Sequence, residues 1–214
     1  MAIDKEVYQQ IISELKKHQV TLVAVSKTKP ATDILELYQL GQRDFGENYV
    51  QELVDKASQL PPDIRWHYIG HLQTNKVKYI APFVHLIHGV DSIKLLQEIN
   101  KQAAKNNRVI DVLLQIHIAE EETKFGLNKA ELNELMNEIA TMPLANIQIC
   151  GLMGMASFTN DKEKVRSEFK RLKSILNNQR LPTLSMGMSG DYKMAIEEGS
   201  TMVRIGSILF GTRN

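Results

Sequence analysis

Lys27 is the residue of this sequence that is best placed to take part in a chemical reaction. It ends the run 22–27, whose valines predict a strand that points Lys27 to the same side as Val23 and Val25. If these valines fill a barrel, the Lys27 amine rises at its mouth, where it can form a Schiff base with a carbonyl compound. On residue type alone, Lys27 and Lys29 could be two solvated loop lysines, because lysine is seldom buried.

Two glycine and serine segments near the C-terminus have the composition of an anion site. The first contains Gly187, Ser189 and Gly190, and the second contains Gly206 and Ser207. Glycines let backbone N–H groups approach an anion, and serine hydroxyls can donate to it. One such segment could simply make a turn, but two of them in adjacent loops favour a phosphate site.

Arg204 precedes the second segment within a strand pattern. Alternation places it on the face of Met202 and opposite the apolar Val203, and an inward arginine needs an anionic or hydrogen-bonding partner. In a closed barrel the first and last strands are neighbours, so Lys27 and Arg204 would share one mouth. An amine, a guanidinium and a phosphate site together fit pyridoxal phosphate (PLP).

The elements that must position these residues alternate between strand and helix. Strands are predicted at 22–27, 44–47, 65–70, 86–90, 111–118, 147–155, 183–188 and 202–210. Helices are predicted at 5–18, 32–40, 49–60, 75–81, 92–106, 128–142, 161–178 and 192–198. This order predicts one α/β domain over residues 1–214, a (β/α)₈ TIM barrel with an extra N-terminal helix. An open doubly wound sheet is the alternative.

Composition points to small-molecule partners. The 214 residues are 43% hydrophobic. The positive charges (Lys+Arg 26) nearly equal the negative charges (Asp+Glu 25), so the chain has no overall excess of positive charge that would attract nucleic acid or an anionic membrane. One cysteine excludes an internal disulfide and fits a reducing compartment. The charged, amphipathic N-terminus differs from a signal peptide, and no apolar run approaches the roughly 20 residues of a membrane helix. We therefore expect a cytoplasmic protein.

Six segments in this order resemble one family. They are 24–30, 45–52, 66–76, 151–153, 187–189 and 202–207. The chain resembles the pyridoxal phosphate homeostasis proteins, single-barrel relatives of the alanine racemase N-terminal domain. The resemblance implies a fold type III PLP barrel, with these site residues: Lys27 as the Schiff-base lysine, Arg204 at the pyridine nitrogen, Ser189, Gly206 and Ser207 at the phosphate, and Asn48 and Met153 near the ring. Glu47, His71 and Asn75 fall in the same motifs without an assigned role.

The resemblance implies a PLP carrier or regulator without an established reaction, with PLP-dependent apo-enzymes as possible recipients. An arginine at the ring nitrogen weakens the cofactor as an electron sink. The related racemases take a second base, a tyrosine, from a separate C-terminal domain across a dimer. Because this sequence ends at Asn214, we expect a monomer that is not an enzyme. A PLP-dependent amino-acid racemase remains the alternative.

The sequence offers residues for two further kinds of site. A sugar-phosphate barrel enzyme without a cofactor would need a carboxylate base at a strand end, for which Glu47 and Asp91 are candidates. His67 and His71 span a strand and its loop, and no H-E-x-x-H motif is present. His85, His88 and His117 are therefore expected to be hydrogen-bonded strand histidines, and no metal is expected.

Overall fold

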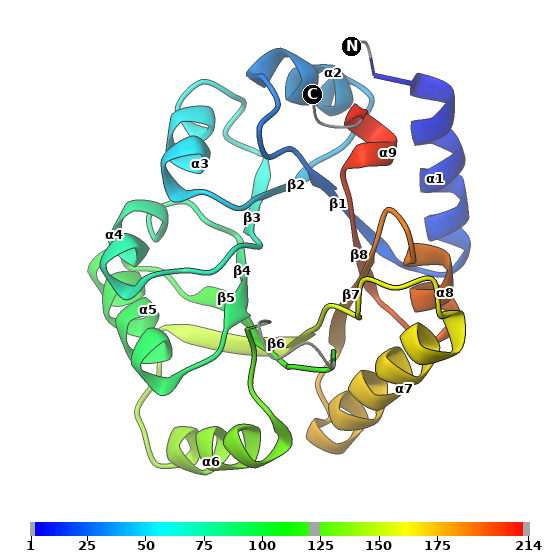
Figure 1. Ribbon diagram of the computed structural model, residues 1–214. Helices are drawn as coiled ribbons and strands as arrows, with labels where there is room; N and C mark the ends of the chain where they lie inside the picture. Colours follow the sequence, from blue (N-terminus) through cyan, green and yellow to red (C-terminus); the bar gives the residue numbers. More distant parts are fainter. Residues whose placement is uncertain (1–2, 120–124, 212–214) are drawn as a thin grey trace.

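Parallel strands close into a barrel that is surrounded by helices (Figure 1). The computed structural model describes residues 3–119 and 125–211. Neighbouring strands follow chain order, and β1 also pairs with β8, which confirms the predicted (β/α)₈ barrel over the open sheet. The strands are β1 (Thr21–Val25), β2 (Asp44–Glu47), β3 (Arg65–Tyr68), β4 (Leu86–Val90), β5 (Ile110–Gln115), β6 (Ile147–Met153), β7 (Thr183–Met188) and β8 (Met202–Ile205).

Several helices begin at a side chain that caps the first turn. Asp4, Ser92, Asn128 and Asp161 each accept hydrogen bonds from backbone N–H groups there. The helices are α1 (Lys5–Lys17), α2 (Ala31–Gln39), α3 (Val50–Ala57), the 3₁₀ turn η1 (Thr74–Lys76), α4 (Val77–Ile80), α5 (Ile93–Lys105), α6 (Lys129–Ala140), α7 (Lys162–Gln179), α8 (Tyr192–Glu197) and α9 (Ser207–Phe210). Over residues 3–119 and 125–211, none of these helices has the length and apolar character needed to span a membrane.

The strands divide the apolar residues between two cores. The larger core lies between strands and helices and includes Phe45, Ile87 and Val203. The smaller lies inside the barrel and contains Val23, Leu86, Leu113, Met153 and Met202. Because strand residues alternate between faces, Arg204 shares the inner side with Met202, as predicted.

Several strands end earlier than predicted at the C-terminal mouth. β1 ends at Val25, and residues 26–29 form a turn closed by the Lys29 N–H, which donates to the Ser26 carbonyl at 3.0 Å. β8 ends at Ile205, and the chain enters α9 after Gly206 instead of continuing as a strand to residue 210. An apolar run does not distinguish a strand from the short helix that follows it. Lys27 and Gly206 therefore lie on loops above the barrel, and Ser207 begins α9.

Candidate functional site

One cavity at the C-terminal end of the barrel gathers most of the predicted site residues. Its volume of about 510 Å³ is within the range of small-molecule sites. Its lining includes Lys27, Asn48, Ser189, Arg204, Gly206 and Ser207. These residues come from β8, from the loops after β1, β2, β7 and β8, and from the start of α9, so the closure of the barrel brings them together.

A buried ion pair between Lys56 and Glu47 stabilises the turn that carries Lys27. Lys56 Nζ lies 2.7 Å from Glu47 Oε1 and donates to the Ser26 carbonyl at 2.8 Å. The Ser26 hydroxyl donates to the same Glu47 oxygen at 2.6 Å. Burial raises the pKa of Glu47, and the Lys56 ammonium opposes that effect. The residue before Lys27 is therefore fixed through both its carbonyl and its side chain.

The residue after Lys27 adopts a left-handed backbone. Thr28 has a φ of 64°, which is unusual for a β-branched residue. Its N–H donates to Glu52 Oε1 at 2.5 Å, and Lys29 Nζ donates to the Phe210 carbonyl at 2.8 Å. Backbone strain of this kind persists where the surroundings impose it, typically at functional sites. The Lys27 turn is thus a fixed structure, in contrast to a pair of solvated loop lysines.

The loops after β7 and β8 meet at Ser189. The Gly206 N–H donates to Ser189 Oγ at 3.2 Å, and the Met188 N–H donates to Asp191 Oδ1 at 2.5 Å. A Cβ atom at Gly206 would lie 3.1 Å from the Val25 carbonyl oxygen, so glycine allows this loop to leave close beside β1. The two segments predicted to hold an anion therefore lie side by side.

Arg204 lies between the barrel interior and the cavity and is only 4% exposed. Its Nη1 donates to the Ser185 carbonyl at 2.8 Å and to Ser185 Oγ at 2.6 Å, and its Nη2 donates to the Gly154 carbonyl at 3.1 Å. Burial lowers the pKa of Arg204 to about 10, against the opposing charge of Asp191. The guanidinium therefore remains a cation at neutral pH. Ser185 and the Gly154 carbonyl supply the hydrogen-bonding partners that an inward arginine was expected to need.

Asn48 lines the cavity and has a buried side-chain oxygen. Its Oδ1 has no hydrogen-bond partner within the described part of the chain. A Cβ atom at Gly70 would lie 2.4 Å from the Asn48 carbonyl oxygen, so glycine lets the loop after β3 pack against this residue. Buried polar groups are normally hydrogen-bonded, so a donor on a ligand would satisfy Asn48.

Met155, rather than Met153, lies at the wall of the cavity. Met153 is 1% exposed and packs inside the barrel with Val23 and Met202. Met155 is two positions further toward the C-terminal end and lines the cavity. The prediction selected the family motif residue Met153, but the alternation of a strand would have pointed to Met155 as well.

The two carboxylates considered as bases lie outside the cavity lining. Glu47 is fully buried against Lys56, and Asp91 is half-buried after β4, where burial raises its pKa. Among the motif residues without a role, His71 stacks on Phe125 with ring centroids 4.4 Å apart and lines a neighbouring cavity of about 720 Å³. Asn75 lies exposed in η1. This arrangement disfavours a sugar-phosphate enzyme that uses Glu47 or Asp91.

Two histidines pair inside the barrel. His67 Nδ1 lies 3.0 Å from His88 Nε2, and His67 Nε2 lies 2.9 Å from Asp44 Oδ1. Possible ligand atoms of Asp44, His67 and His85 lie within 4.8 Å of one another. Sequence analysis missed this grouping because Asp44 and His67 lie in different strands and His85 lies just before β4. Arg65 donates to both Asp44 oxygens, at 2.7 and 2.5 Å, so the carboxylate charge is compensated within the chain.

We expect Asp44 to contribute to stability in a pH-dependent way. Burial alone would raise the pKa of Asp44, but hydrogen bonds from His67 and Arg65 lower it from 3.8 to about 2. The lowered pKa corresponds to about 2 kcal/mol of folding free energy, present above pH 4 and lost as the pH falls through 2. Urea unfolding of Asp44→Asn and wild type across this range will measure it. A stability difference that stays constant down to pH 2 would contradict the prediction.

Comparison with known proteins identifies the family of this chain. Residues 4–214 match the family model of the alanine racemase N-terminal domain. A pyridoxal phosphate homeostasis protein of Aquifex aeolicus is 45% identical over 199 residues, which cover 90% of this chain and 86% of that protein. The chain belongs to the pyridoxal phosphate homeostasis protein family. The human member of this family is 40% identical and the alignment covers 100% of this chain and 85% of the relative.

Solved structures agree with this membership in the pyridoxal phosphate homeostasis protein family. The PLP-bound structure of PipY from Synechococcus elongatus has a TM-score of 0.86 at 33% identity, over 96% of this chain and 100% of that one. Alanine racemase from Bartonella henselae has a TM-score of 0.72 at 19% identity, over 99% of this chain and 60% of the racemase. The racemase shares the barrel fold, and the resemblance predicted from the sequence motifs is confirmed.

Proposed function

We propose that this protein binds PLP in the cavity at the C-terminal end of the barrel and takes part in PLP homeostasis. Lys27 would hold the cofactor aldehyde as a Schiff base, and Arg204 would face the ring nitrogen. The observation that carries the proposal is the convergence of an amine, a buried guanidinium and two serine and glycine loops on one cavity. The PLP-bound structure of PipY, a relative with the same fold, supports it.

The donors in the cavity fit the chemical groups of PLP. Ser189, Gly206 and Ser207 offer hydroxyl and backbone N–H groups where the loops after β7 and β8 meet, a common phosphate position in such barrels. The unsatisfied Oδ1 of Asn48 can accept from a polar substituent of the ring. Met155 lines the same cavity and offers apolar surface. The residues present thus match an anionic, aromatic aldehyde.

Arg204 favours a carrier over an enzyme. Bound PLP supplies a reactive aldehyde and an electron-withdrawing ring. With a pKa of about 10, Arg204 keeps its proton at neutral pH, so it would donate a hydrogen bond to the ring nitrogen without protonating it. The electron withdrawal needed for transamination or decarboxylation is therefore weak. We infer reversible holding of PLP, with delivery to PLP-dependent apo-enzymes, by a protein that acts as a cytoplasmic monomer.

Lys27→Ala will abolish the Schiff base while leaving the barrel folded, because this half-buried loop residue lies outside both cores. Wild-type protein mixed with PLP should show a visible absorption band that borohydride removes, with the reduced adduct on Lys27 by peptide mass spectrometry. Lys27→Ala should show neither the band nor the adduct. Its circular dichroism and thermal unfolding should match those of the wild type.

Lys76→Ala is the matched control, since Lys76 lines only the neighbouring cavity among those described. This variant should retain the band and the adduct on Lys27. A wild-type protein that takes up no PLP would overturn the proposed function. An adduct that persists in Lys27→Ala would move the Schiff base to another lysine, such as Lys29 or Lys76.

A further inference from the structure

Five buried side chains form a continuous hydrogen-bonded network through the inside of the barrel. Arg204 donates to Ser185 Oγ at 2.6 Å, and that oxygen lies 3.1 Å from His88 Nδ1. His88 Nε2 lies 3.0 Å from His67 Nδ1, and His67 Nε2 lies 2.9 Å from Asp44 Oδ1. None of the five residues is more than 8% exposed. This interior network therefore connects the cavity with the opposite end of the barrel.

The two ends of the interior network determine its direction. The Arg204 guanidinium can only donate, and the ionised Asp44 carboxylate can only accept. Burial above all holds the pKa of His88 well below 6.5, so His88 is neutral at pH 7. If each ring carries a single proton, one arrangement satisfies every contact. The Ser185 hydroxyl donates to His88 Nδ1, His88 Nε2–H donates to His67 Nδ1, and His67 Nε2–H donates to Asp44.

We infer that Ser185, His88 and His67 are positioning residues for Arg204. These three residues orient the Arg204 guanidinium toward the cavity through a series of hydrogen bonds that all point the same way and end at Asp44. Both hydrogens of Arg204 Nη1 are used by Ser185, and one hydrogen of Nη2 is used by Gly154. Within residues 3–119 and 125–211, this leaves Nε–H and one Nη2 hydrogen for a ligand. The inference rests on the proposed function, in which that ligand is the ring nitrogen of PLP.

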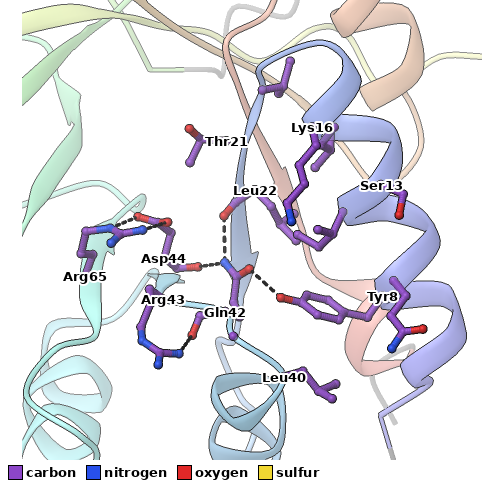
Figure 2. A pocket seen from close by; sticks show the side chains of 15 residues that line it. Tyr8, Ser13, Lys16, Thr21, Leu22, Leu40, Gln42, Arg43, Asp44 and Arg65 are labelled. Carbon is purple, nitrogen blue, oxygen red and sulfur yellow. Dashed lines mark hydrogen bonds and ion pairs between the residues drawn. The ribbon is translucent and has the colours of Figure 1, made fainter.

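The far end of the interior network is anchored at the N-terminal rim of the barrel. There Arg65 pairs with Asp44 at the edge of a cavity of about 580 Å³ beside α1 (Figure 2). Gln42 donates to the Asp44 carbonyl at 2.7 Å and to the Leu22 carbonyl at 2.9 Å, which ties β2 to β1 at this level. The last acceptor of the network is therefore held by both its side chain and its backbone.

The histidine protonation states provide a direct test that needs no cofactor. Long-range ¹H–¹⁵N NMR of the full-length wild-type protein at pH 7.5 will report which ring nitrogens carry protons. From the hydrogen-bond geometry, we expect each of the two rings to carry a single proton, on Nε2. A proton on Nδ1 of either ring would overturn the direction of the network.

Ser185→Ala tests the effect on Arg204, with Ser200→Ala as the matched control. Ser200 is also buried, at 4% exposed, but its hydroxyl lies 2.8 Å from the Met186 carbonyl and outside the interior network. We expect Ser185→Ala to weaken PLP binding about tenfold, as for the loss of one hydrogen bond to a charged group. It should also shift the His88 Nδ1 resonance and the visible band of bound PLP. Ser200→Ala should change none of these.

The outcomes separate this inference from the proposed function. A wild-type protein that takes up no PLP would contradict the proposed function, while the NMR spectrum would still test the network. If the wild type binds PLP and Ser185→Ala binds it within about twofold of Ser200→Ala, the positioning of Arg204 by Ser185 is wrong. Thermal unfolding of both serine variants will show whether the loss of a buried hydroxyl affects stability equally.

Discussion

Replacing Lys56 with methionine will lower the free energy of unfolding by about 3–5 kcal/mol, because the buried Glu47 carboxylate loses its cation. The Lys56 side chain is 8% exposed and that of Glu47 is 0% exposed, so water cannot compensate the loss. The substitution also removes the donor to the Ser26 carbonyl, beside Lys27. Urea unfolding will measure the stability, and we expect slower formation of the visible PLP band.

Lys101→Met is the control for this substitution. Lys101 pairs with Glu98 at 3.6 Å, but its side chain is 61% exposed, so its loss should cost about 0.5 kcal/mol or less. Combining Lys56→Met with Glu47→Gln should recover part of the lost stability, because the uncompensated charge is removed. If Lys56→Met alone lowers the free energy of unfolding by less than about 1 kcal/mol, the prediction that the buried pair stabilises the fold is wrong.

Gly151→Ala will destabilise the barrel by about 4 kcal/mol or more, or prevent folding. A Cβ atom at this position would lie 1.9 Å from the Thr183 carbonyl oxygen, in the backbone of the adjoining strand β7. Backbone atoms in a paired strand cannot move aside as a flexible side chain can. Thermal unfolding followed by circular dichroism will measure the loss. The distortion would also reach Gly154, whose carbonyl accepts from Arg204.

Gly190→Ala separates this steric effect from a general intolerance of glycine substitutions. A Cβ atom at Gly190 would meet nothing within 4 Å, although this residue lines the cavity next to Ser189. Its φ is not among the positive values of the described glycines, so we expect a change within about 0.5 kcal/mol and unchanged PLP uptake. Equal stabilities of the Gly151→Ala and Gly190→Ala proteins would contradict the predicted clash.

The sequence by itself determined the barrel and the loops that line its mouth. Alternating strand and helix patterns require parallel strands with crossover helices, and their number favours closure. The position of a residue at the C-terminal end of a strand is a local property of the chain. Lys27, Ser189, Arg204, Gly206 and Ser207 could therefore be predicted, and all five line one cavity. The fixed turn around Lys27 was beyond prediction because Lys56 and Glu52 belong to a different element.

Only the tertiary structure decided which inward residues meet inside the barrel. Alternation predicts the face of each strand, but the height of a residue depends on the register between strands and on how the barrel closes. Register shifts occur where β4 pairs with β5 and where β7 pairs with β8. The sequence therefore could not show that His67 and His88 link Asp44 to Ser185. Side chains from separate strands meet at one level only once every register is fixed.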